Sequence, residues 1–421
     1  MSTEQLSLRW TSAINSLRRV IMAPRYNFER AYHPGGRQLL VDVSTIIKAD
    51  GRTGIQRVVR ALLGQLVRID IPGVTVQPVF ASRDHGFCKA LFLNDGSLVN
   101  AGTHPSTRET VKVNADDIFL GLDLAAQTLP AVERQLAGWR HLGVSINIIV
   151  YDLLPSTHPD WFPSRLVRRF RKWTDIVARQ SDRCICISRT VAQTLRDQLA
   201  RSSVSRLPEI SSIPLGSDIA ASYPSSGLPS DYSILLKWIR QRRTALAVGT
   251  IEPRKGHEQL LDAFDHIWQS DKSSEIALLV VGRPGWRTKR LQKRILNHPE
   301  RGARLMWLDQ VSDQFLTQIY GSCAGLIAAS YQEGFGLPLL EAAANGAPVL
   351  ARDTPIFREV GGSLFDYFQD ENKIALANTI VQWVSSARPT SREALGCFPS
   401  WRESAEALLD CLQIKFNRTE F

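Results

Sequence analysis

Short apolar runs that alternate with amphipathic helical segments constrain the fold of this chain most strongly. The runs are too short for helices and are apolar on both faces, which is typical of strands buried in a parallel sheet. Clear helical patterns occupy 54–67 and 189–200. This alternation predicts an α/β fold with a doubly wound sheet. In the first half of the chain, the predicted strands are 38–44, 74–80, 116–123, 144–152 and 183–188.

The same alternation resumes after a stretch rich in Ser, Pro and Gly, with predicted helices at 257–268, 313–323 and 337–346. A chain of 421 residues exceeds what one hydrophobic core usually organises, so we expect two Rossmann-like lobes. The predicted parts are a basic amphipathic segment at 1–35, a first lobe at 36–220, a linker at 221–240, a second lobe at 241–395 and a C-terminal helix at 396–421 that returns to the first lobe.

The net charge of +10 and the pI near 9.5 favour an anionic partner. Two segments, 6–25 and 161–173, mix arginines with large apolar side chains, and 161–173 interleaves five cations with aromatic residues. Such segments either lie on an anionic membrane surface or pack their apolar side against the protein. The sequence lacks a recognisable nucleic-acid-binding motif, so nucleic acid is not the expected partner.

The cysteines and the absence of long apolar runs bear on location. The six cysteines are scattered along the chain, which favours reduced thiols in the cytoplasm. No apolar stretch approaches the ~18 residues of a spanning helix, and the N-terminus lacks a signal-peptide pattern. We therefore expect a cytoplasmic protein that is peripheral on the inner face of the cytoplasmic membrane.

An acidic and glycine-rich bend lies between a predicted strand and a predicted helix at 330–350. Ligands of open α/β sheets gather at the carboxyl ends of the strands, which places Glu333 in the crevice and Glu341 about one turn into the helix. Gly334 and Gly336 allow backbone amides to approach a diphosphate at the helix start. The two acids then accept hydroxyl hydrogen bonds on either side of the diphosphate, as in a nucleotide-sugar. The alternative is a helix cap at Glu333 and a solvated Glu341.

A pair of cations, Arg254 and Lys255, follows another predicted strand and precedes a helix. Positive side chains at the start of a helix are repelled by the positive end of the helix dipole. A bound anionic ligand would offset this unfavourable electrostatic energy. One planar guanidinium beside one ammonium can neutralise a pyrophosphate leaving group. The alternative is a charged turn of a surface helix.

The segments 248–264, 308–320 and 331–351 resemble the donor-binding half of retaining GT-B glycosyltransferases of family 4, the group 1 glycosyltransferases, and most closely those that build bacterial surface polysaccharide. The resemblance extends from about 245 to 362, and it is looser at 53–63 and 150–163. At 150–163 the family commonly has a histidine before the aspartate, where this chain has Tyr151. His158 is a weaker candidate than Asp152 for a role on the acceptor side. For Arg57, a place in a surface loop and capped helix is about as good an interpretation as a role in donor binding.

The resemblance implies roles for particular residues. The implied catalytic residues are Arg254, Lys255, Glu333 and Asp152, with Asp152 orienting or deprotonating the acceptor hydroxyl. The implied donor-binding residues are Gly54, Gly249, Gly334, Phe335, Gly336, Leu337 and Glu341, with Gly54 and Arg57 approaching the donor phosphates from the first lobe.

The implied reaction is transfer of a sugar, with retention of its anomeric configuration, from a nucleotide-sugar to a lipid-linked oligosaccharide. GDP-mannose is the expected donor. Polysaccharide-assembly enzymes are possible partners. No cofactor or metal is expected, since the chain lacks an Asp-x-Asp motif. The alternatives are a nucleotide-sugar epimerase, a phosphorylase, or a non-catalytic scaffold. A nicotinamide enzyme is disfavoured because no G-x-G-x-x-G opens a βαβ unit.

Overall fold

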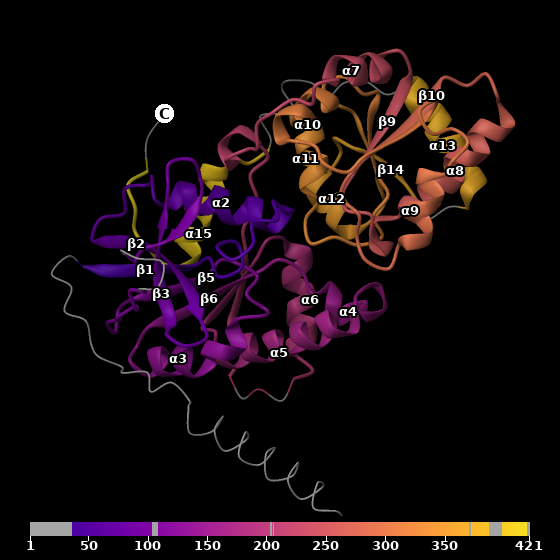
Figure 1. Ribbon diagram of the computed structural model, residues 1–421. Coiled ribbons are helices and arrows are strands. Elements are labelled where there is room, and N and C mark those ends of the chain that lie inside the picture. The colour runs from indigo at the N-terminus through magenta and orange to yellow at the C-terminus, as the bar shows by residue number, and fades with distance from the viewer. Residues whose placement is uncertain are drawn as a thin grey trace, which may run out of the picture.

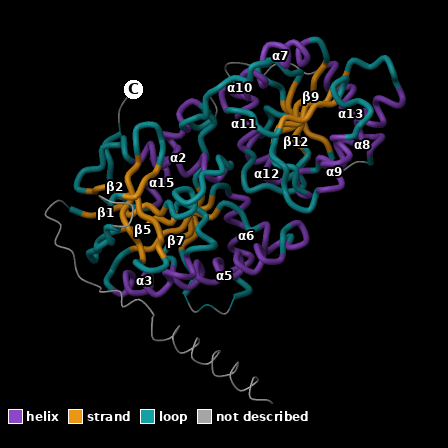
Figure 2. The backbone as a smooth tube through the Cα atoms, in the orientation of Figure 1, coloured by secondary structure: helices purple, strands orange, loops and turns teal. Residues whose placement is uncertain are grey.

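The computed structural model describes residues 36–102, 108–202, 204, 206–369, 372–386 and 398–418. The chain forms two α/β lobes, each with one central sheet between helices (Figures 1 and 2). The predicted α/β fold with two doubly wound lobes is therefore confirmed. The predicted basic segment at 1–35 lies outside the described residues.

The first lobe contains an eight-stranded sheet of order β4-β3-β2-β1-β5-β6-β7-β8. Its strands are parallel except for β3 and β4, which form an antiparallel edge that the sequence analysis did not predict. The strands are β1 (Arg37–Asp42), β2 (Val74–Ser82), β3 (Gly86–Phe92), β4 (Leu98–Asn100), β5 (Ile118–Gly121), β6 (Ser145–Val150), β7 (Arg183–Cys186) and β8 (Glu209–Ser212).

Helices cover both faces of this sheet. Buried side chains of α2 and α15 fill one face, and those of α3, α5 and α6 fill the other. The helices of this lobe are α2 (Gly54–Leu66), α3 (Leu129–His141), α4 (Leu154–Thr157), α5 (Ser164–Gln180), α6 (Arg189–Leu199) and the C-terminal α15 (Trp401–Cys411). Short 3₁₀ turns lie at Pro159–Trp161 and Ala220–Ser222.

The second lobe contains a six-stranded parallel sheet of order β11-β10-β9-β12-β13-β14. Its strands are β9 (Arg243–Val248), β10 (Ile276–Val281), β11 (Leu305–Leu308), β12 (Gly325–Ala328), β13 (Val349–Arg352) and β14 (Asp366–Phe368). Its helices are α7 (Tyr232–Arg240), α8 (His257–Ser270), α9 (Lys289–Leu296), α10 (Asp313–Tyr320), α11 (Leu337–Ala344), α12 (Pro355–Gly361) and α13 (Lys373–Ser386), with a 3₁₀ turn at Pro253–Lys255.

The connection between the lobes differs from the predicted linker at 221–240. Helix α7 forms within that range, and its Leu236, Trp238 and Ile239 are buried in the core of the second lobe. The Ser-, Pro- and Gly-rich composition obscured this apolar helical spacing. The non-helical connection therefore ends near Asp231, where α7 begins.

The basic segment at 161–173 also differs from expectation. Its aromatic residues Phe162, Phe170 and Trp173 are 6%, 2% and 1% exposed, so they belong to the cores of the first lobe. The interpretation of these rings as lipid-facing was wrong, because helical spacing shows that one face is apolar but not what covers it. Four cations of the segment are exposed, namely Arg165, Arg168, Arg171 and Lys172. Within the described residues, no helix combines the length and apolarity needed to cross a bilayer.

Candidate active site

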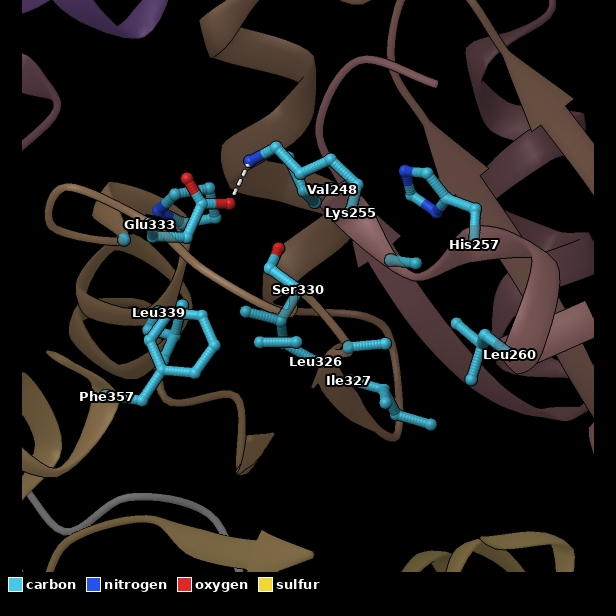
Figure 3. Close-up of a pocket in the computed structure, with 15 residues that line it drawn as sticks. Val248, Lys255, His257, Leu260, Leu326, Ile327, Ser330, Glu333, Leu339 and Phe357 are labelled. Carbon is cyan, nitrogen blue, oxygen red and sulfur yellow. Dashed lines mark hydrogen bonds and ion pairs between the residues drawn. The ribbon is translucent and has the colours of Figure 1, made fainter. Parts of the chain in front are cut away.

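Glu333 and the two cations predicted from the sequence meet at the carboxyl edge of the second sheet. Arg254 and Lys255 lie in the 3₁₀ turn after β9, and Glu333 lies in the loop between β12 and α11. The Glu333 carboxylate accepts one hydrogen bond from Arg254 Nη1 and one from Lys255 Nζ, each at 2.5 Å. Figure 3 shows the contact between Lys255 and Glu333, which both line a small cavity. Glu252 is a second partner of Arg254, at 3.0 Å.

The charges of this cluster stabilise one another. Burial by itself opposes ionisation of Glu333, but the charges of Arg254 and Lys255 outweigh it and lower the pKa of the carboxyl to about 2. Burial likewise opposes the charge of Arg254, and Glu333, Glu252 and Asp152 nevertheless raise the pKa of its guanidinium. Glu333 and Arg254 are therefore both charged at neutral pH.

Two glycines explain how the backbone brings these groups together. Gly256 has a φ of +68° and ends the cationic turn, and an added Cβ would lie 2.2 Å from the carbonyl oxygen of Ala329. Gly334 packs against the first lobe, since a Cβ there would lie 2.1 Å from the carbonyl oxygen of Tyr151. The Ser188 hydroxyl of the first lobe also donates to the carbonyl oxygen of Gly334 at 3.0 Å. The loop that carries Glu333 is thus in contact with both lobes.

Asp152 lies on the first-lobe side of this contact. Its Oδ1 accepts a hydrogen bond from the Leu154 backbone N–H at 3.1 Å. Burial raises the pKa of its carboxyl, and the nearby positive charge of Arg254 only partly offsets the effect. The structure therefore brings Asp152 together with the cationic cluster. His158, the weaker candidate, stacks on Trp161 with ring centroids 4.2 Å apart.

Glu341 lies in α11 and has partners in both lobes. The Tyr320 hydroxyl of α10 donates to Glu341 Oε2 at 3.1 Å, and Arg57 of α2 forms an ion pair with Glu341 Oε1. Arg57 forms a second ion pair with Asp313, at the start of α10. Arg57 is therefore not the solvated surface residue of the alternative interpretation, and Glu341 is buried rather than solvated.

The remaining predicted donor-binding residues occupy the edge between the lobes. Gly249 directly follows β9, and an added Cβ there would lie 3.1 Å from the Lys255 side chain. Phe335 and Leu337 pack their side chains against the hydrophobic cluster of the first lobe. Gly336 is the residue before α11, and Gly54 begins α2 opposite Leu337.

Sequence reasoning missed His257, the first residue of α8. This side chain is 5% exposed, and neither ring nitrogen has a hydrogen-bond partner. Burial, with the charge of Lys255, lowers the pKa of His257 to about 4, so the ring is neutral at pH 7. With Lys255, Ser330 and Glu333 it lines a cavity of about 20 Å³ (Figure 3). The sequence signal that could have indicated His257 as a site residue is its position two residues after Lys255.

No group of three or more His, Cys, Asp or Glu side chains in the described part of the chain is arranged to hold a metal ion. The arrangement provides instead two cations, a carboxylate between them and, at the start of α11, a helix N-terminus without a side-chain cap. Such a set can bind a diphosphate and stabilise negative charge on it.

Comparison with known proteins identifies the family. The model of the family described as glycosyl transferases group 1 matches residues 236–396, which contain the cluster around Glu333. The serotype-specific mannosyltransferase WbdA of Escherichia coli is 36% identical over 391 residues, 91% of this chain. The second lobe of the chain carries the group 1 glycosyltransferase domain. The chain spans about half the length of these curated relatives, 47% of WbdA. The O-antigen chain mannosyltransferase B of Escherichia coli is 31% identical over 195 residues, 45% of this chain and 46% of that protein.

Solved structures of glycosyltransferases share the arrangement of the lobes. Sucrose-phosphate synthase from Thermosynechococcus elongatus superposes with a TM-score of 0.61 at 17% identity, over 90% of this chain and 98% of that one. Anabaena HepE in complex with UDP and glucose has a TM-score of 0.56 at 14% identity, over 89% and 95% of the two chains. At this low identity the likeness shows the fold, which is GT-B. The predicted fold and family are therefore confirmed.

Proposed function

We propose that this group 1 glycosyltransferase chain transfers a hexose from a nucleotide-sugar to a growing bacterial surface polysaccharide. The observation that carries the proposal is the cluster of Arg254, Lys255 and Glu333 beside the glycine bend, where the loops of both lobes meet. Its relatives include a serotype-specific mannosyltransferase and an O-antigen chain mannosyltransferase, so mannose is the preferred sugar and GDP-mannose the preferred donor. The polysaccharide is O-antigen, capsule or exopolysaccharide.

The proposed chemistry is electrostatic. When the bond between the sugar and the diphosphate breaks, negative charge develops on the leaving phosphate, and Arg254 and Lys255 are placed to receive it. Glu333 holds both cations in position and accepts hydrogen bonds from sugar hydroxyls. The open N–H groups at the start of α11 bind the diphosphate, and Glu341 accepts from the ribose.

We propose retention of anomeric configuration and no requirement for metal. A phosphate oxygen of the leaving group takes the acceptor proton on the face from which it departs. Asp152 assists by orienting the acceptor hydroxyl across the contact between the lobes. Two fixed cations supply the neutralisation that a bridging divalent ion supplies in other glycosyltransferases. Added EDTA should therefore leave the rate of transfer unchanged.

The proposed acceptor is a lipid-linked oligosaccharide at the inner face of the cytoplasmic membrane. Support comes from the exposed cations of α5, namely Arg165, Arg168, Arg171 and Lys172, which suit an anionic lipid surface. Polysaccharide-assembly enzymes are possible further partners. The buried aromatic rings of this helix make no contribution, so binding to vesicles should be electrostatic and should weaken as salt is added.

The donor is tested by a thermal-shift panel of GDP-, UDP- and dTDP-linked sugars. A ligand that binds only the folded protein raises its melting temperature by mass action, so the true donor should give the largest shift. A transfer assay with that donor and a mannose-terminated acceptor then follows the glycosylated product. The absence of a shift with every nucleotide-sugar would contradict the proposal.

Two alternatives predict different results. An epimerase would convert the donor into an isomeric nucleotide-sugar without acceptor, and a phosphorylase would need inorganic phosphate or a sugar phosphate. A scaffold would keep its role after Arg254→Ala and Lys255→Ala, so polymer assembly in cells would survive both changes but not deletion of the gene. We expect both substitutions to abolish assembly.

A further inference from the structure

Arg57 is the cation that joins the nucleoside side of the site to the opposite lobe. It lies in the first turns of α2, and its two terminal nitrogens contact Glu341 of α11 and Asp313 of α10. The side chains of Arg57, Asp313 and Glu341 are 17%, 15% and 6% exposed. A guanidinium with one carboxylate on each terminal nitrogen is a specific arrangement rather than a loose surface ion pair.

The two carboxylates depend on this cation. Burial opposes the charge of Glu341 and raises the pKa of its carboxyl, while Arg57 acts in the opposite direction. Asp313 adds a second negative charge to the same small volume and favours protonation of Glu341 further. Loss of Arg57 would make the charged form of Glu341 less favourable and so weaken it as an acceptor of ribose hydroxyl hydrogen bonds.

Asp313 also connects this group to the chain that joins the lobes. Its Oδ2 accepts hydrogen bonds from the backbone N–H of Ser225 at 2.7 Å and from the Ser225 hydroxyl at 2.8 Å. Ser225 lies in the connection between the lobes, before α7. Arg57 therefore contacts one carboxylate of the proposed nucleoside site and one carboxylate that is fixed to the interlobe connection.

We propose that Arg57 is a positioning residue for the nucleoside half of the donor, so that this half-site is complete only when the two lobes are together. The inference rests on the proposed function, because it concerns how a nucleotide-sugar is bound. It differs from the role that the family resemblance implied, since Arg57 acts on the nucleoside through Glu341 and does not contact the phosphates. Donor binding and closure of the lobes then become linked, and each favours the other.

The test compares Arg57→Met, which keeps an unbranched apolar stem and removes the guanidinium, with the unmodified protein. Affinities for GDP, UDP and inorganic pyrophosphate are measured by calorimetry or by competition against the donor. The affinity for the preferred nucleoside diphosphate should fall about 10- to 100-fold, the usual value of a charged hydrogen bond. Pyrophosphate has no ribose, so its affinity should change less than about 2-fold.

A matched control is Arg179→Met, which removes an ion pair with Glu133 on the far side of the first lobe, at 2.9 Å. It should leave all three affinities unchanged. Arg57→Lys keeps one charge but reaches only one carboxylate, and it should restore part of the nucleoside diphosphate affinity. Because Arg57 acts through Glu341, the two substitutions should not be additive. In a protein that already carries Glu341→Gln, Arg57→Met should reduce the affinity for the nucleoside diphosphate much less than it does alone.

The outcomes separate this inference from the proposed function. If the unmodified protein binds a nucleotide-sugar and Arg57→Met binds it equally well or more tightly, the inference is wrong and the function stands. Equal losses for pyrophosphate and for the nucleoside diphosphate would also overturn it, because Arg57 would then act on the phosphates. If the unmodified protein binds none of these ligands, the proposed function itself fails.

Discussion

At the scale of single residues, the balance of charge around Glu333 governs the site. One buried carboxylate lies between two cations, so it occupies contacts that we assign to the donor diphosphate. A phosphate that enters the site must share Arg254 and Lys255 with Glu333. This competition makes Glu333 both a structural partner of the cations and a limit on how tightly they hold the product.

Glu333→Gln should therefore have opposite effects on catalysis and on product binding. The amide cannot hold the two cations as a carboxylate does, so we expect the rate of transfer to fall by about 10²-fold. Removal of the competing negative charge should strengthen inhibition by the product GDP, or by whichever nucleoside diphosphate is released. Steady-state kinetics with product inhibition measure both effects. Parallel losses in rate and in product affinity would contradict this account.

Asp42 gives a prediction for the dependence of stability on pH. It is fully buried at the end of β1, where burial and the charge of Asp123 raise the pKa of its carboxyl from 3.8 to about 7. Between these values the folded protein holds a proton that the unfolded chain releases, so the contribution of Asp42 to stability is lost as pH rises toward 7.

Asp42→Asn should remove this dependence. We expect the gain in the free energy of unfolding to be larger at pH 8 than at pH 5 by about 1 kcal/mol or more, because position 42 then has no carboxyl to ionise. Urea unfolding at the two pH values measures the difference. An unchanged slope between pH 5 and 8 would show that Asp42 does not titrate in this range.

At the scale of elements, α15 attaches the end of the chain to the first lobe. Trp401 is 1% exposed, and its indole N–H donates to the carbonyl oxygen of Asp218 at 2.8 Å. The helix packs beside α2, the element that carries Arg57 (Figure 1). The position of α2 at the edge of the cleft therefore depends in part on the far end of the sequence.

Trp401→Ala should loosen this attachment. Loss of a fully buried tryptophan costs about 3–5 kcal/mol, and the effect should appear as faster hydrogen exchange in both α15 and α2. Asp410→Ala, in the same helix but exposed, is the matched control and should leave the exchange of α2 unaltered. Faster exchange confined to α15 would mean that α2 is held by other contacts.

At the scale of the whole molecule, the site exists because two lobes meet. Glu333 and the cations belong to the second lobe, Asp152 and Arg57 to the first, and Gly334 lies at the contact. A side chain at position 334 would collide with the carbonyl oxygen of Tyr151 and hold the lobes apart.

Gly334→Ala should therefore reduce transfer by at least about 10-fold, because a small displacement of reacting groups is costly. Each lobe should stay folded, and small-angle scattering should report a larger radius of gyration than for the unmodified protein. Gly321→Ala is the control, since a Cβ there has its nearest neighbour 3.8 Å away. Full activity of Gly334→Ala would indicate that the lobes do not close as described.

The sequence by itself determined the lobes, most strands and the family. Buried parallel strands show as short apolar runs, and strand ends carry the ligand-binding loops, so Arg254, Lys255 and Glu333 could be assigned to one crevice before any coordinates. These signals are local, because each depends on neighbours within a few residues.

Only the tertiary structure decided which groups face one another across the lobes. Arg57 and Glu341 are 284 positions apart, and nothing in either segment indicates the other. Packing between distant segments also decided three other features. These are the burial of Phe170 and Trp173, the burial of the His257 ring, and the inclusion of α7 in the core of the second lobe. A sequence pattern shows that a face is apolar or charged, but the partner that covers it is chosen when the whole chain packs.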